Sequence, residues 1–221
     1  MSWEKKMRTQ KLRIVVLGSA AVLALVLSAC ASGEPDLTPL PSTDASTVAE
    51  ETASVPEKPG VEDLPLVAEP PATESAAIDW AVRATYGYIA VEGDVMNNHP
   101  DDTSELALIA KGNASDLISY YAGRLAETGN IRSGNAYYEA LAERSSVATS
   151  GDASATRFGR VEVWGCYGSG DVTLTDADGK PLEHANIPPA PMWLLAEYDA
   201  TSSIWYIVDI DPLPQDAAFS C

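Results

Sequence analysis

Two aspartates near the end of the sequence have the types and spacing of an acid–base pair. Asp209 and Asp211 stand in the stretch Val208–Pro212, at the end of an expected strand. Two carboxyl groups that share a cavity repel each other when both are ionised, which separates their pKa values and suits acid–base chemistry. An exposed strand end explains the same two residues more simply, and we favour that interpretation.

The histidines and the acidic stretch around Asp176 are weak candidates for metal binding. His99 precedes a proline in an expected turn and His184 lies in a polar stretch, so we interpret both as solvated loop residues. The stretch Asp176–Gly179 resembles the start of a calcium-binding loop, but its glycine comes too early for that spacing. Because an Asp-Gly pair is typical of tight turns, we predict a hairpin turn here.

Several common catalytic motifs are absent from the sequence. It contains no Gly-x-Ser-x-Gly, no His-Glu-x-x-His and no Gly-rich phosphate loop that ends in Lys-Ser or Lys-Thr. We therefore assign no catalytic residue and expect neither a cofactor nor a bound metal.

The thiol of Cys30 stands in a distinctive context, directly after Leu27, Ser28 and Ala29. Five Lys and Arg residues in the first 13 positions and an apolar run over residues 14–27 precede it, as in a secretory signal peptide. The run is short for a membrane span, although an uncleaved membrane anchor remains the alternative. We expect residues 1–29 to be a signal peptide.

The order Leu27-Ser28-Ala29-Cys30 resembles the lipobox of bacterial lipoproteins. The resemblance implies that Cys30 becomes the first residue of the mature chain and carries a diacylglyceryl thioether, with a further acyl chain in some members. One acyl chain anchors a protein only marginally, whereas two or more hold it stably. The expected location is the extracytoplasmic face of a bacterial cell membrane, with the membrane as a partner through the acyl chains on Cys30.

The segment 30–75 has the composition of a flexible linker. From residue 31 on it contains eight prolines, ten acidic residues, one lysine and no aromatic residue. Because such a composition cannot form a core, we expect a disordered stalk over residues 30–75 and a folded domain over residues 76–221. The domain holds 21 acidic and 8 basic residues. Its charge of −13 argues against nucleic acid as a partner.

Cys166 and Cys221 are the two remaining cysteines. In an exported chain, which folds in an oxidising compartment, a disulfide between them is the default. Their wide spacing does not match a Cys-x-x-Cys redox motif, and two thiols without a nearby histidine do not complete a tetrahedral zinc site. We therefore predict a Cys166–Cys221 disulfide.

Periodicity predicts helices in the first half of the domain and strands in the second. Helical spacing, as in Ile78, Val82 and Ile89, predicts a first helix that follows a cap at Ser75. Three helices are expected, over residues 76–96, 102–109 and 113–128. Two-residue alternation with β-branched and aromatic residues predicts strands over residues 137–147, 156–167, 171–175, 192–198 and 204–209.

This element order predicts an α+β fold in which three N-terminal helices pack on a curved antiparallel sheet of four to five strands. In order and length the domain resembles the NTF2-like or cystatin-like roll. Together with the lipobox and the acidic stalk, the whole chain resembles a group of actinobacterial lipoproteins.

Two functions remain open for the domain. The first is a non-catalytic surface domain that binds a protein, a cell-wall component or a small apolar ligand. The second is an enzyme of the isomerase or dehydratase kind, in which an Asp, Tyr or His in the cone implied by the NTF2-like resemblance acts as general acid or base. Such an enzyme should carry a buried carboxyl with a raised pKa. The aromatic residues of the domain either line the cone or fill the core.

The lipidation expectation is tested by metabolic labelling with radioactive palmitate in a bacterial host. The wild-type chain should incorporate label and the Cys30→Ala variant should not, because the acyl chains attach at that thiol. Equal labelling of the two chains, including none in either, would contradict the assignment.

Overall fold

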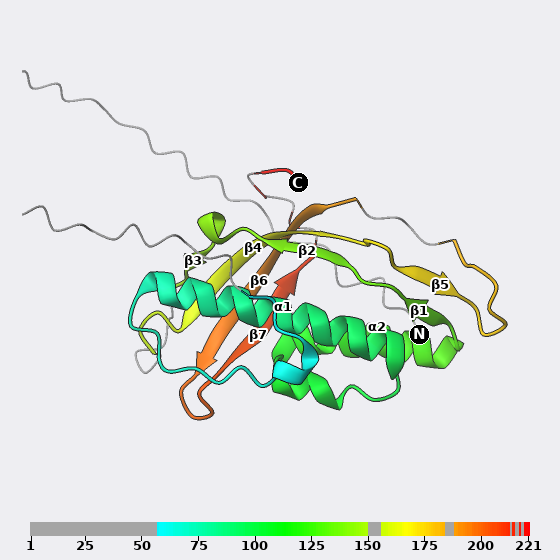
Figure 1. Cartoon of the computed structure of the whole chain (residues 1–221), viewed down its shortest axis with the longest axis horizontal. Coiled ribbons are helices and arrows are strands. Elements are labelled where there is room, and N and C mark those ends of the chain that lie inside the picture. Colours follow the sequence, from blue (N-terminus) through cyan, green and yellow to red (C-terminus); the bar gives the residue numbers. More distant parts are fainter. Residues whose placement is uncertain (1–56, 150–155, 184–187, 213, 215–216, 218) are drawn as a thin grey trace, which may run out of the picture. The chain divides into compact units, whose positions relative to one another are not determined.

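The computed structural model describes residues 57–149, 156–183, 188–212, 214, 217 and 219–221. In these residues two α-helices precede the long strands (Figure 1): α1 (Glu74–Asn98) and α2 (Gly112–Thr128), with single 3₁₀ turns η1 (Val61–Asp63) and η2 (Ser104–Leu108). The remaining elements are β1 (Ile131–Ser133), β2 (Tyr137–Ala140), η3 (Ala142–Arg144), β3 (Ser146–Val147), β4 (Arg160–Gly168), β5 (Thr173–Thr175), β6 (Ala190–Asp199) and β7 (Ile204–Asp211). The signal peptide and the lipobox residues Leu27 to Cys30 lie outside the described residues, as does His184.

The strands form two antiparallel sheets. The larger has the order β2-β4-β6-β7, with β3 also paired to β4, and the smaller consists of β1 and β5. Two short bridges, Val67 with Ile204 and Ala110 with Ile207, cover part of the outer edge of β7. Covered edges matter because an open strand edge is a template for aggregation. The α+β class and the antiparallel sheet are thus as expected.

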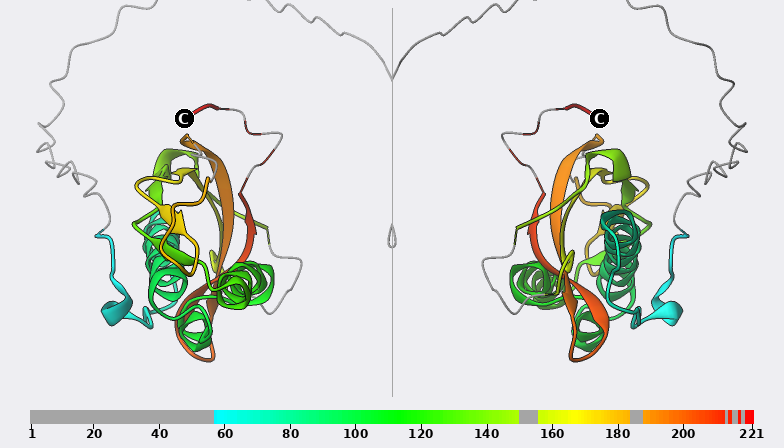
Figure 2. Two further views of the ribbon diagram at one scale, coloured as in Figure 1. Left: turned by 90° about the vertical axis from the view of Figure 1, so that its right-hand side faces the viewer. Right: turned by 90° about the vertical axis from the view of Figure 1, so that its left-hand side faces the viewer.

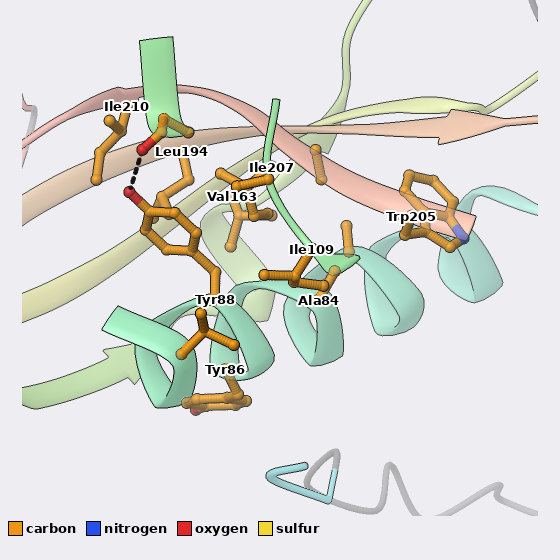
Figure 3. Close-up of a cluster of buried hydrophobic side chains, with 14 of the residues drawn as sticks. Ala84, Tyr86, Tyr88, Ile109, Val163, Leu194, Trp205, Ile207 and Ile210 are labelled. Carbon is orange, nitrogen blue, oxygen red and sulfur yellow. Dashed lines mark hydrogen bonds between the residues drawn. The ribbon is translucent and has the colours of Figure 1, made fainter. Parts of the chain in front are cut away.

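The core lies between α1 and one face of the larger sheet, which Figure 2 shows nearly edge-on. Small residues of α1, Ala77, Ala81 and Ala84, have no exposed surface, which lets the helix approach the strands closely. On the sheet side the fully buried residues include Val163 and Ile207. The Tyr88 hydroxyl crosses this core and donates a 3.0 Å hydrogen bond to the Ala114 carbonyl of α2 (Figure 3). No helix among the described residues is long and apolar enough to span a bilayer.

The cap of α1 differs from the expected one. The Thr73 hydroxyl, not that of Ser75, accepts a hydrogen bond from the Ala76 amide at 3.1 Å. Since an N-cap oxygen satisfies an amide of the first turn, the helix begins two residues earlier, at Glu74.

The expected helix over residues 102–109 is absent, so the prediction of three helices is wrong. Its place is taken by the 3₁₀ turn η2, and the backbone then leaves the helical path. The Ile207 amide donates to the Ile109 carbonyl, and the Lys111 amide donates to the Ile207 carbonyl, each at 2.9 Å. The backbone of Ile109 and Lys111 therefore forms hydrogen bonds with β7 instead of continuing a helix.

The helix α2 begins at Gly112 rather than at residue 113 or 115, and it has no side-chain cap. It ends, as expected, at Gly129, whose φ of +68° is the left-handed conformation that glycine adopts without strain.

Four predicted strands, over residues 156–167, 171–175, 192–198 and 204–209, are present with shifted ends as β4, β5, β6 and β7. The expected strand over residues 137–147 is broken into β2, the turn η3 and β3. Within that break the Leu141 amide still donates to the Trp164 carbonyl, at 2.8 Å, so the chain stays beside β4. Strand β1 was not predicted, because its three residues, Ile-Arg-Ser, carry no alternating pattern.

The folded contacts begin before residue 76. Leu66 and Ala68 are nearly buried, at 5% and 7% exposure. The Ala68 amide donates to the Ser203 carbonyl at 2.9 Å, and the Tyr198 hydroxyl donates to the Ala68 carbonyl at 3.1 Å. The described part of the segment expected to be a stalk thus includes an arm that packs on the β6–β7 hairpin.

The predicted disulfide is present. Cys166 of β4 and Cys221 are bonded, with their Cα atoms 5.7 Å apart. Close by, the Phe219 ring meets the Trp164 ring edge to face at 5.8 Å, and the Arg144 guanidinium lies over Phe219. The disulfide and these ring contacts hold the segment after β7 to β4.

The disulfide should stabilise the domain measurably. Closing a loop of 55 residues is worth about 4 kcal/mol in the chain-entropy description, so Cys166→Ser with Cys221→Ser should lower the free energy of unfolding by up to that amount. Denaturant unfolding of both proteins measures it. Alkylation followed by mass measurement should find these two thiols only after reduction, and free thiols beforehand would contradict the bond.

Candidate functional site

Glu92 is the titratable residue that stands out in the structure. It lies on the face of α1 that also carries Tyr88 and Met96, one helical turn to each side. Its side chain is only 11% exposed, and its Oε1 is 3.3 Å from Nη2 of Arg132, which is 8% exposed. A charged residue is rarely buried to this degree unless it is paired, so the position is unusual enough to suggest function.

The partner Arg132 comes from β1 and is held from two sides. Besides Glu92, its Nη1 donates to Oδ1 of Asn97 at 3.0 Å. The Asn97 amide group in turn donates to the Gly134 carbonyl at 2.9 Å. Both side chains from α1 therefore fix the guanidinium, and Asn97 ties the end of β1 to the helix.

Two glycines turn the smaller sheet toward α1. Gly134, between β1 and β2, has a φ of +86°, and Gly170, between β4 and β5, has a φ of +56°. A Cβ atom at Gly134 would collide with the carbonyl of Asp171, and one at Gly170 would collide with that of Asn135. The two left-handed backbone turns pass so close to each other that only glycine fits at both positions. These turns place β1 and β5 beside the helices.

Two adjoining pockets lie between α1, α2 and the strands, with volumes of about 410 and about 360 Å³. Both volumes lie in the range of roughly 300–1,000 Å³ that is typical of ligand sites. The pockets share four lining residues, Glu92, Met96, Tyr121 and Tyr167. The pair of pockets is called the α1–α2 pocket below, and Glu92 lies at the junction of its two halves.

The two halves differ in polarity. The larger half is also lined by polar side chains, and these are Arg124, Thr128, Asn130, Arg132 and Ser169. The smaller half is lined chiefly by apolar residues, and these are Ile89, Leu117, Ile118, Met192, Ile210 and Pro212. Tyr121 is 51% exposed and stands where the pocket meets solvent.

Burial raises the pKa of the Glu92 carboxyl, and the neighbouring Arg132 guanidinium opposes this only in part. Its second oxygen, Oε2, is buried and has no hydrogen-bond partner among the described residues. A protonated carboxyl can place its proton on that oxygen and offer it to a ligand. Burial, then the nearby Glu92, also raises the pKa of Tyr167 to about 12, so its phenol stays neutral.

His99 acts in the structure as a charged cap rather than as a metal ligand. Its Nδ1 lies 2.8 Å from the Asp102 carbonyl and its Nε2 lies 2.8 Å from Oδ2 of Asp94. These hydrogen bonds raise the pKa of His99 to about 9, with the Asp102 carbonyl as the largest cause. Asp94, His99 and Glu105 are also close enough to hold a cation, which would have to displace the proton of His99.

The acidic stretch at Asp176 forms the predicted hairpin turn. Oδ1 of Asp176 accepts hydrogen bonds from the amides of Asp178 and Lys180, and Gly179 has a φ of +81°. The carboxylate of Asp176 is thus engaged by the turn's own backbone, as expected for a turn of this kind.

Asp209 and Asp211 do not enter the α1–α2 pocket. They line a separate hollow of about 520 Å³ together with Glu162, Trp164 and Trp193. Because their strand neighbours Val163 and Leu194 face the core, the two tryptophans lie on the opposite face of the sheet. Asp211 is exposed, as the simpler interpretation expects, whereas Asp209 is half-buried and accepts a 2.8 Å hydrogen bond from the Asn113 side chain.

Neither Glu92 nor Arg132 was among the sequence candidates. The signal for Glu92 was available, since the apolar spacing of Ile78, Val82 and Ile89 continues to position 92, where a carboxyl group stands. Arg132 carried no comparable signal, because its partner lies 40 residues away and β1 was not recognised.

The raised pKa of Glu92 predicts a pH dependence of stability. Between the usual glutamate pKa of about 4.3 and the raised one, the native state holds a proton that the unfolded state has lost, so native stability falls as pH rises through this window. Relative to wild type, the Glu92→Gln variant should therefore gain free energy of unfolding with rising pH, by up to about 1.4 kcal/mol per pH unit. Denaturant titrations from pH 4 to pH 9 measure this difference.

The control for that measurement is Glu143→Gln, the same chemical change at an exposed position of η3. A pH profile of Glu92→Gln that merely follows the profile of this control would show that Glu92 titrates as an ordinary surface carboxyl.

Comparison with known proteins adds no family. No protein-family model matches the sequence, and no curated protein matches it. Among solved structures, the chain is similar to the intermembrane space region of the chloroplast protein ARC6, with 13% identity and a TM-score of 0.42. The similarity covers 66% of this chain and 100% of that chain, and at this strength it assigns no function.

Proposed function

We propose that this protein is a lipid-anchored binding domain on the extracytoplasmic face of a bacterial cell membrane, and that the α1–α2 pocket holds a small, mostly apolar molecule. In this proposal residues 1–29 are the signal peptide, Cys30 carries the acyl chains, and the segment up to the arm at Leu66 is the tether. The disulfide is compatible with an oxidising compartment.

The observation that carries the proposed binding function is the buried carboxyl at the junction of the pocket. A largely apolar cavity with a few convergent polar groups is the usual form of a small-molecule site. Buried polar atoms are nearly always hydrogen-bonded, so the unpartnered Oε2 of Glu92 fits a ligand or water that completes it. The domain's charge of −13 supports a partner other than nucleic acid.

The fold is proposed to be an NTF2-like roll. Support comes from the helix α1 packed across a strongly twisted antiparallel sheet, and from the bends at Gly134 and Gly170 that close one end of it.

A second candidate function is an enzyme of the isomerase or dehydratase kind, because Glu92 is the buried carboxyl with a raised pKa that this alternative requires. Glu92 would act as general acid or base. If the domain only binds its ligand, the ligand is recovered chemically unchanged. If the domain is an enzyme, the wild-type protein converts the ligand and the Glu92→Gln variant does not.

Binding is tested on the unacylated chain 31–221, which retains every residue that the structure describes. The neutral fluorophore N-phenyl-1-naphthylamine should bind with one saturable site and increased emission, because the pocket removes its rings from water. Leu117→Trp, which fills the apolar half, should weaken binding at least tenfold, whereas Val67→Trp, an enlargement at a residue outside this pocket, should not. Equal affinity in all three proteins, or no saturable binding, would refute the proposal.

A further inference from the structure

The α1–α2 pocket is locally basic on a strongly acidic domain. Two of the eight basic residues of the domain, Arg124 and Arg132, line its larger half, and Glu92 is the one acidic residue among the lining residues of either half. A locally positive cavity on a protein of opposite charge favours a negatively charged ligand group at that spot.

The two arginines are placed differently. Arg132 is nearly buried and fixed by Glu92 and Asn97, so it offers a preformed cation at the floor of the larger half. Arg124 is 56% exposed and its Nη1 donates to Glu127 at 2.8 Å, as a surface pair one helical turn apart. Since such exposed pairs are worth at most about 1 kcal/mol, Arg124 can turn to a ligand at little cost.

The two oxygens of Glu92 differ in their contacts. Its Oε1 is engaged by Arg132, and Oε2 is the unpartnered atom at the junction of the two halves. In the protonated state that burial favours, Oε2 carries a hydrogen and donates it to an acceptor. Two guanidinium groups line the larger half, and the carboxyl group held by one of them can donate from Oε2 when it is protonated, which is a donor set for an oxyanion.

The apolar half continues directly from this donor set. Ile89, Leu117, Ile118 and Met192 line it, and the hydroxyl of Tyr88 is already used by the Ala114 carbonyl. A ligand that fills both halves therefore needs an apolar chain on one side and a negatively charged oxygen-rich group on the other.

We infer that the ligand of the α1–α2 pocket is a single-chain amphipathic anion, with its carboxylate or phosphate head at Arg132 and Arg124 and its hydrocarbon chain in the apolar half. This inference rests on the proposed binding function and specifies its ligand class. A fatty acid and a lipid phosphate monoester share this chemistry.

Displacement of N-phenyl-1-naphthylamine from the unacylated chain 31–221 at pH 7 tests the inference, with four competitors of equal chain length used below their micelle concentrations. Dodecanoate and dodecyl phosphate should displace the fluorophore at concentrations about tenfold lower than dodecan-1-ol and dodecylamine, the size of effect expected from charge-assisted hydrogen bonds. The better of the two anions identifies the head group.

The variant Arg124→Gln, at an exposed position, should lower the affinity for both anions by about threefold and leave the affinity for the alcohol unchanged. Arg132→Gln should remove most of the preference for anions, and its fold is checked by circular dichroism because it also unpairs Glu92. The matched control is Arg144→Gln, which replaces an exposed arginine that lies over Phe219. It should change neither the affinity for the anions nor the affinity for the alcohol.

The outcomes separate this inference from the proposed function. If the alcohol or the amine binds as tightly as the anions, or if the fluorophore binds and no competitor displaces it, the anion inference is wrong and the binding function stands. If the fluorophore itself does not bind, the proposed function fails, and the inference fails with it.

Discussion

The packing of α1 on the larger sheet is the constraint on which the rest of the domain depends. This one helix contacts strands of both sheets, the helix α2 and all three 3₁₀ turns. Close approach requires small side chains, which Ala77, Ala81 and Ala84 supply, and larger ones such as Val91 and Val95 fill the remaining space without exposed surface. Because the helix is 25 residues long, its last two turns extend to the smaller sheet, and the pocket forms there.

The buried pair of Glu92 and Arg132 joins those last turns to β1. Burial costs several kcal/mol of desolvation for each member of the pair that is charged, and a pair with one unpartnered oxygen recovers only part of it. Apolar residues of similar size would satisfy the packing equally well. A buried polar pair that costs more than apolar packing would is consistent with both functions considered for this pocket.

The sequence predicted the elements whose signals are local. The periodic apolar spacing of α1, the left-handed glycine at the end of α2 and the β-branched residues of β6 and β7 each act within a few residues, and these elements are present with shifted ends. The predicted helix over residues 102–109 failed because the backbone of Ile109 and Lys111 pairs with β7, about 100 residues away. The site was missed for the same reason, since the partner of Glu92 comes from a three-residue strand far along the chain. The disulfide was predictable because the expected lipidation of Cys30 left two cysteines to pair.

The Cys166–Cys221 bond also changes how the domain would respond to force. It closes a covalent ring that contains β5, β6 and β7, so the β6–β7 hairpin at the edge of the larger sheet lies wholly inside the ring. Tension applied between the arm at Leu66 and Cys221 passes across the sulfur bridge, and the chain between the two cysteines, which are 55 positions apart, carries no load. At about 3.5 Å per extended residue, roughly 190 Å of contour length is withheld from stretching. Under a load that pulls the helices away, the β6–β7 hairpin would thus keep its extent.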